Sequence, residues 1–225
     1  MARKIQTEKS KKRKAFRTFL LIVIILGLLG VGGFYGWKYL HKKPGQKVVQ
    51  EVKILDSIDE YGYSISDRDS KYYQSEYDVL KKILLDKPVD NEKYATQVAK
   101  MFTIDLYTLS TKINKYDIGG NEFFISDKKE MFEQKVMDTM YSTMLDDTYG
   151  DRKQTLPEVK NVKVISTTKT TYKLGDKGVD AYLVKMEITY VEDYKYDTQA
   201  SVVVVQENDI KWSVVDSQPT LNPKY

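Results

Sequence analysis

The first long hydrophobic run in the chain covers twenty consecutive residues without a charge, from Thr18 to Trp37. A helix of that length is about 30 Å long, which matches the hydrocarbon core of a bilayer. The run is longer than the apolar part of a cleavable signal peptide, and it ends in bulky aromatic side chains that are typical of a membrane interface. The pattern therefore predicts an uncleaved signal anchor, with a transmembrane helix over residues 18–40.

Further along the chain, apolar residues recur first at helical spacing. Residues 52–66 alternate weakly and predict a strand or a hairpin. Three amphipathic segments follow, and they predict helices from Asp69 or Ser70 to about residue 85, from Asp90 to about residue 114, and from Asp127 to about residue 144. In the third segment, Asp127 and Glu130 have the spacing of a capping box.

After Gly150 the hydrophobic period changes from that of a helix to that of a strand. Strands are predicted over four segments separated by turns: 157–171, about 182–190, 201–206 and 210–216. Three helices followed by a four-strand antiparallel meander predict an α+β domain, with the helices packed on one face of a curved sheet. The predicted fold class is therefore one transmembrane helix followed by this α+β domain.

Positive charge is concentrated on both sides of the apolar run. Eight of the 36 basic side chains lie in residues 1–17, where Glu8 is the only acid, and four more lie in residues 38–47. The larger excess before the run predicts a cytoplasmic N-terminus and a single-pass topology at the cell membrane. Residues 48–225 keep 24 basic and 31 acidic side chains, a net charge of −7, so we expect no nucleic-acid partner.

These boundaries divide the chain into four parts. A basic cytoplasmic tail (1–17) and the transmembrane helix (18–40) precede a short linker (41–50) and an extracytoplasmic domain (51–225). The domain is long enough for one ordinary hydrophobic core. The sequence contains no cysteine, which excludes disulfides, thiolate metal ligands and a cysteine nucleophile.

The order of elements carries a resemblance to known proteins. Over most of residues 70–216, and in the closing strand Trp212–Asp216, it resembles the nuclear transport factor 2-like, cystatin-like cone folds. With the N-terminal anchor, it more distantly resembles the bitopic subunits of type IV secretion and conjugation machines. Short runs resemble uncharacterised anchored proteins of Gram-positive bacteria, for which no activity is implied: DEYGY (59–63), DRD (67–69), FTIDLYTL (102–109) and RKQTLP (152–157).

Asp105 is the one catalytic candidate. It lies between Phe102, Leu106 and Leu109, at the edge of the apolar stripe of the second predicted helix. A desolvated carboxylate there would have a raised pKa and, in a cone-fold pocket, could act as a base. The structural alternative, in which Asp105 accepts hydrogen bonds from a tyrosine or the backbone, is favoured.

The other motifs predict neither a cofactor nor a metal. His41 is the only histidine and lies beside the apolar run, which excludes imidazole catalysis and histidine-bound zinc in the domain. The acidic run Asp67–Asp69 lacks the alternating oxygens of a calcium loop. Gly119-Gly120 lacks the spacing of a phosphate-binding loop and is typical of a turn.

The sequence favours a binding module over an enzyme. Tyr194 and Tyr196 lie in a charged turn and are candidates for partner binding, because tyrosine combines apolar area with a hydroxyl. The leading hypothesis is a membrane-anchored scaffold that contacts the lipid bilayer and other envelope or membrane proteins, as part of an envelope, secretion or conjugation assembly. A homo-oligomer through Gly32-x-x-x-Gly36 is a weaker expectation. The alternative is a cone domain that binds or transforms a small apolar ligand, with Asp105 in its pocket.

Overall fold

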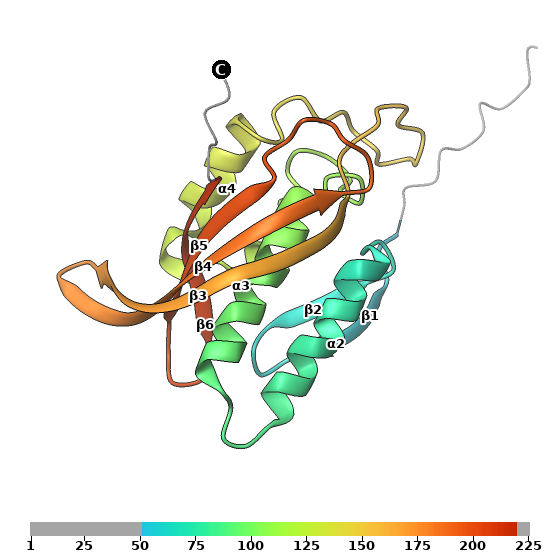
Figure 1. Cartoon of the computed structure of the whole chain (residues 1–225). Coiled ribbons are helices and arrows are strands. Elements are labelled where there is room, and N and C mark those ends of the chain that lie inside the picture. Colours follow the sequence, from blue (N-terminus) through green and yellow to red (C-terminus); the bar gives the residue numbers. More distant parts are fainter. Residues whose placement is uncertain (1–50, 220–225) are drawn as a thin grey trace, which may run out of the picture. The chain divides into compact units, whose positions relative to one another are not determined.

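The computed structural model describes residues 51–219, which form an α+β domain (Figure 1). A two-stranded hairpin and three helices precede a four-stranded sheet. The elements are β1 (Ile54–Ile58), β2 (Tyr63–Ser66), α2 (Lys71–Leu85), α3 (Asn91–Tyr107), the 3₁₀ turns Asn121–Phe123 and Ser126–Lys128, α4 (Lys129–Asp138), β3 (Val159–Leu174), β4 (Lys177–Tyr190), β5 (Gln199–Gln206) and β6 (Trp212–Pro219).

The predicted antiparallel meander is confirmed. The strands lie in the order β3-β4-β5-β6, and every neighbouring pair is antiparallel. The alternation along β4 is also confirmed, because the residues of one face are buried: Tyr182, Val184, Met186 and Ile188. Between β3 and β4 the chain turns at Gly175, whose φ of 61° is a conformation that favours glycine.

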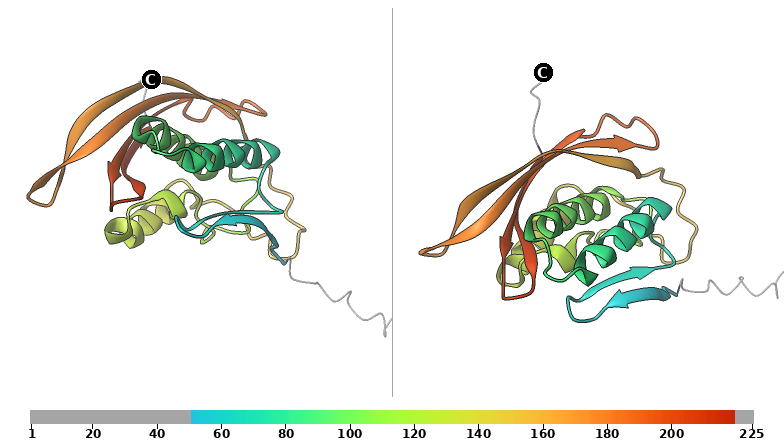
Figure 2. Two further views of the ribbon diagram at one scale, coloured as in Figure 1. Left: turned by 90° about the horizontal axis from the view of Figure 1, so that it is seen from below. Right: turned by 60° about the horizontal axis from the view of Figure 1, so that its bottom comes forward.

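The three helices lie on the concave side of the sheet (Figure 2). α3 is the central helix, and residues on several of its sides are buried, among them Tyr94, Ala95, Val98, Met101 and Phe102. Other parts of the chain also pack against α3, including the hairpin residue Tyr63, whose hydroxyl lies 2.9 Å from that of Tyr94. Layering around α3 therefore creates a single apolar core.

The predicted start and end of α2 and the predicted start of α3 are confirmed, whereas the predicted end of α3 is wrong. Ser70 and Asp90 cap α2 and α3, since their side chains accept hydrogen bonds from the backbone N–H groups of Tyr73 and Lys93. The predicted second helix extended to about residue 114, but α3 ends at Tyr107. After that residue the chain leaves the helix, and the N–H groups of Leu109 and Ser110 donate to the carbonyl of Pro157 instead.

The third predicted helix is also corrected. It starts at Lys129, after a 3₁₀ turn, and ends at Asp138 rather than near residue 144. The predicted capping box does not form, because Lys128 occupies the cap position and makes no side-chain capping bond. Beyond Asp138 the chain continues in turns, and Tyr141 and Met144 are buried there outside a helix.

The predicted fold class needs one correction. Three helices on a four-stranded antiparallel sheet are confirmed, but the transmembrane helix is not: no helix within residues 51–219 is long and apolar enough to cross a membrane. The longest, α3, has 17 residues and carries charged side chains such as Lys100 and Asp105, whereas a span needs about 20 mostly apolar residues. The segment 18–40, on which that prediction depended, lies outside the described residues, as do the predicted tail and linker.

Candidate functional site

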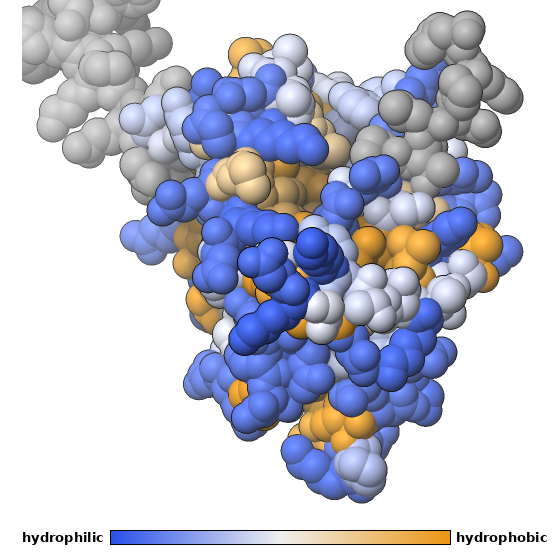
Figure 3. All heavy atoms as spheres, turned by 90° about the vertical axis from the view of Figure 1, so that its left-hand side faces the viewer, coloured by the Kyte–Doolittle hydropathy of each residue, from blue (hydrophilic) through white to orange (hydrophobic). Residues whose placement is uncertain are grey.

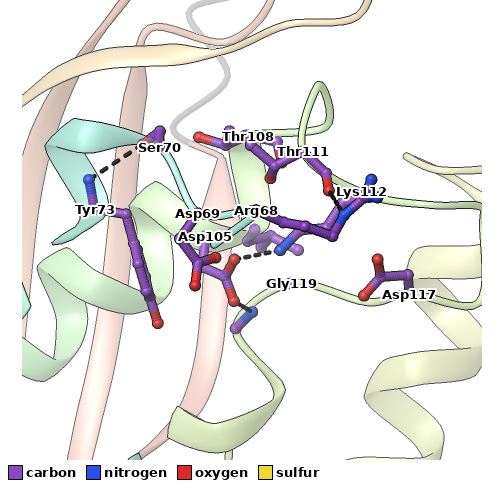
Figure 4. Close-up of polar contacts among 12 residues, drawn as sticks. Arg68, Asp69, Ser70, Tyr73, Asp105, Thr108, Thr111, Lys112, Asp117 and Gly119 are labelled. Atoms are coloured by element: carbon purple, nitrogen blue, oxygen red, sulfur yellow. Dashed lines mark hydrogen bonds and ion pairs between the residues drawn. The ribbon is translucent and has the colours of Figure 1, made fainter. Parts of the chain in front are cut away.

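Asp105 lies in a buried polar cluster where α3 meets the loop that follows it (Figure 4). Its Oδ1 atom forms an ion pair with the ammonium group of Lys112, and its Oδ2 atom accepts a hydrogen bond from the backbone N–H of Gly120 at 2.6 Å. The two side chains of the pair are only 15% and 8% exposed. Both carboxylate oxygens of Asp105 therefore already have protein partners.

Lys112 is held as a cation at this position. Burial by itself would lower the pKa of Lys112, but Asp105, Tyr141 and Asp117 more than offset it and raise that pKa above its ordinary value. The charge on Lys112 is thus retained because an anion neutralises it. This is the arrangement of a structural ion pair, in which each charge offsets the free-energy cost of burying the other.

The loop after α3 is fastened by further hydrogen bonds to backbone groups. Arg152 donates from its Nη1 atom to the carbonyls of Lys112 at 2.9 Å and Leu145 at 3.2 Å, and from its Nη2 atom to the carbonyl of Ser110 at 3.1 Å. Tyr141 donates its hydroxyl hydrogen to the carbonyl of Leu106 at 2.8 Å. The carbonyl of Leu106 lies in the last turn of α3, where no helical N–H follows to bond it, and the bonds from Arg152 join carbonyls of the loop after α3 to the segment after α4.

The cluster contains a second carboxylate, Asp69, just before α2. Its Oδ2 atom accepts hydrogen bonds from the backbone N–H and the hydroxyl of Ser66, at 2.6 and 3.0 Å. Burial raises the pKa of Asp69. The crevice between Asp69, Tyr73 and Asp105 leaves no room for a water molecule, and no group of acidic side chains within residues 51–219 is arranged to hold a metal ion. The geometry of the cluster therefore indicates a structural role, in which its side chains hold neighbouring segments of the chain together.

A different part of the domain has space for a ligand. A groove with a volume of about 480 Å³ lies beside α4, and we call it the α4 groove. Its apolar lining comes from the end of α3, from α4 and the segments just before and after it, and from β6, and includes Leu106, Phe124, Phe132, Val136, Met140 and Val215. Figure 3 faces the side of the molecule where α4 and the β3–β4 turn lie, and shows an apolar hollow bordered by hydrophilic residues.

Aromatic stacking stabilises the wall of the α4 groove. The rings of Phe124 and Phe132 are stacked, with centroids 4.2 Å apart and planes at 11°, and Phe102 packs against Phe132 at 5.6 Å. Phe124 is also tied to the sheet, because it forms a bridge with Val214 in β6. The wall is therefore fixed by packing before any ligand arrives.

Polar side chains occur at a few positions of the groove. Lys128 is half-buried; its ammonium group donates to the Tyr172 hydroxyl at 3.3 Å and lies 5.3 Å from the centre of that ring. Lys135 lies seven residues further along the chain, in α4, and is exposed. Neither lysine forms an ion pair with any carboxylate among residues 51–219, although Asp216 also lines the groove.

The two tyrosines chosen as partner-binding candidates lie in the β4–β5 loop. The hydroxyl of Tyr194 donates to Glu192 at 2.7 Å, and its ring packs against Tyr196, which is 44% exposed. Tyr194 also borders a second hollow, of about 280 Å³, together with Arg152. Neither tyrosine contributes to the α4 groove. Their role in partner binding stays a prediction.

Sequence reasoning missed Glu122, which is half-buried beside the β1–β2 hairpin. Its Oε1 atom accepts a hydrogen bond from the Tyr73 hydroxyl at 2.9 Å, and its Oε2 atom accepts one from the backbone N–H of Ser64 at 3.1 Å. Burial raises the pKa of Glu122 to about 7. Sequence reasoning also missed the α4 groove. Only the short amphipathic pattern of residues 129–138 could have indicated one wall of the groove.

Comparison with known proteins leaves the site to be interpreted from its own geometry. No family model matches the chain, and no curated protein or solved structure matches it. The resemblance to cone-fold domains therefore stays a prediction.

Proposed function

We propose that the domain is a binding module whose α4 groove takes an elongated apolar ligand. The observation that carries this proposal is the apolar groove of about 480 Å³ beside α4. Small-molecule sites are typically concave, mostly apolar and about 300–1,000 Å³ in volume, with a few polar groups that orient the ligand. The α4 groove has each of these properties.

The packing of the groove favours binding over chemistry. Its walls are apolar side chains, and its titratable lining residues outside the tyrosines are Lys128, Lys135 and Asp216. Asp105, the catalytic candidate of the sequence, is not among the lining residues and has protein partners for both oxygens. Binding would gain free energy mainly from the apolar area that leaves water.

A matched pair of substitutions tests the proposal. Met131 lines the groove and is 67% exposed, whereas Leu145 is an equally exposed apolar residue, at 61%, that does not line it. Met131→Glu places a carboxylate at the groove, and Leu145→Glu makes the same change elsewhere. We expect Met131→Glu to weaken the binding of a fluorescent apolar probe to the full chain about tenfold, through the cost of desolvating a charge.

The measurement is a fluorescence titration of parent, Met131→Glu and Leu145→Glu, with far-UV circular dichroism to compare their folding. Leu145→Glu should bind the probe like the parent. Equal affinities for all three proteins would show that the probe binds outside the α4 groove and would contradict the proposal.

A further inference from the structure

We infer that the α4 groove selects a single-chain amphiphile with a carboxylate head group. This inference rests on the proposed function and adds the chemical class of the ligand. The charges that line the groove and the position of the lysines relative to the apolar walls support it.

The charge lining the groove is positive. Lys128 and Lys135 contribute two positive charges and Asp216 one negative charge, which gives a net of +1. This excess contrasts with residues 48–225 as a whole, whose net charge is −7. A site with one unbalanced positive charge complements a monoanion, such as a carboxylate, better than a cation or a neutral molecule.

The lysines lie where they can reach one head group. They are seven residues apart on α4 and its N-terminal boundary, which corresponds to about 10 Å along the helix axis and to the same side of the helix. Each ammonium group sits on a flexible four-carbon stem, so both can approach an anion between them. Neither has to break an ion pair to do so, since neither forms one among the described residues.

Lys128 is already positioned by its neighbour. The Tyr172 hydroxyl accepts a hydrogen bond from the ammonium group at 3.3 Å, and the ring lies beneath it at 5.3 Å from the centroid. This contact uses one of the three donors of the ammonium group and leaves two for a ligand. The apolar tail would then lie along Phe132 and Val136, which follow Lys128 on the buried side of α4.

The experiment compares three ligands of equal chain length: decanoate, decanol and decyltrimethylammonium. The full chain carries ¹³C-labelled methionine methyl groups, since Met131 and Met140 line the groove whereas Met101 and Met186 are buried elsewhere. NMR shifts of the groove methionines then report binding at this site alone. We expect decanoate to bind at least tenfold more tightly than decanol, and decyltrimethylammonium to bind more weakly than decanol, because charge-assisted hydrogen bonds are the stronger ones.

The double substitution Lys128→Gln/Lys135→Gln should remove the preference for decanoate while decanol still binds. The matched control, Lys129→Gln/Lys163→Gln, changes the net charge equally but alters lysines that do not line the groove. Decanol binding to both double variants shows that each is folded. The control should keep the tenfold preference.

The outcomes separate the two proposals. Equal affinities of the parent for decanoate and decanol, or a preference for decanoate that survives Lys128→Gln/Lys135→Gln, would overturn the inferred head-group selectivity and leave the binding function standing. If no ligand shifts the signals of Met131 and Met140, the proposed function itself fails.

Discussion

At the scale of single residues, Asp105 and Glu122 are two partly buried acids in contrasting settings. Asp105 is neutralised by Lys112, so its charge is compensated where it lies. Glu122 receives hydrogen bonds from Tyr73 and Ser64 but forms no ion pair among the described residues, and burial raises its pKa to about 7. The charge of Asp105 is offset by an ion pair, whereas the raised pKa of Glu122 makes the stability of the domain depend on pH.

The Asp105–Lys112 pair leads to a prediction about stability. Asp105→Asn keeps the shape of the side chain but leaves Lys112 as a buried cation without its anion. We expect the free energy of unfolding to fall by about 3 kcal/mol, the usual cost of removing one partner of a buried pair. Urea unfolding at pH 7 measures this, and Asp105→Asn/Lys112→Met should recover part of the loss. Unchanged stability in Asp105→Asn would contradict a structural role for the pair.

Glu122 should make the domain less stable as pH rises. Its pKa in the folded state, about 7, is above the ordinary value of 4.5, so between these values the folded state binds more protons than the unfolded state. The stabilisation is therefore complete below about pH 4.5 and is lost as pH rises through 7, by at most about 3 kcal/mol. Glu122→Gln should flatten this fall between pH 5 and 8, in urea unfolding at several pH values.

The control for Glu122→Gln is Glu60→Gln, because Glu60 is exposed in the turn of the same hairpin. It should follow the parent at every pH. If Glu122→Gln showed the same pH dependence as the parent, another group would be responsible for it.

At the scale of elements, the close contact between α3 and the loop of residues 117–120 positions the polar cluster. Gly119 lies against the helix backbone: a Cβ atom there would be 2.2 Å from the carbonyl oxygen of Asp105. Only glycine permits this approach, and it brings the N–H of Gly120 to the Asp105 carboxylate at 2.6 Å. The loop and the helix thus depend on each other.

Gly119→Ala should therefore destabilise the domain by more than a matched glycine substitution. The added methyl group meets backbone atoms, which cannot move away without shifting α3, and we expect a loss of about 3 kcal/mol or more. Gly62→Ala is the control: its φ is 69°, but nothing lies within 4 Å of the added Cβ, so only the conformational cost of about 1 kcal/mol applies. Equal losses of stability in the two variants, measured by thermal or urea unfolding, would contradict the close approach of Gly119 to the backbone of α3.

The same elements show what sequence patterns predict and what they do not. The β4 alternation is visible because one face of the strand is buried, and the caps Ser70 and Asp90 are local signals. The end of α3 is set by distant groups, since Leu109 and Ser110 bond to Pro157. In a helix continuing to residue 114, Asp105 and Lys112 would be about 10 Å apart along the axis, so their ion pair could not be foreseen.

At the scale of the whole molecule, the sheet, α3 and α4 together create the α4 groove. Its lining residues come from segments as distant in the sequence as Leu106, Tyr172 and Val215. No local pattern predicts such a groove, because its existence depends on how the layers pack. The sequence hypothesis of a membrane-anchored scaffold depends on the apolar run, the short linker and the lack of a catalytic set, and it stays a prediction; the groove instead supplies a place where a small ligand can bind.

Binding in the α4 groove is tested most directly by mapping where a ligand attaches. Decanoate carrying a photoreactive diazirine near the end of its tail is bound to the full chain, irradiated and located by mass spectrometry. We expect the label on groove residues such as Phe132, Val136 and Met140, with competition by unlabelled decanoate and about tenfold less labelling in Met131→Glu. Saturable labelling of residues 51–219 only at sites away from the α4 groove, unaffected by Met131→Glu, would contradict it.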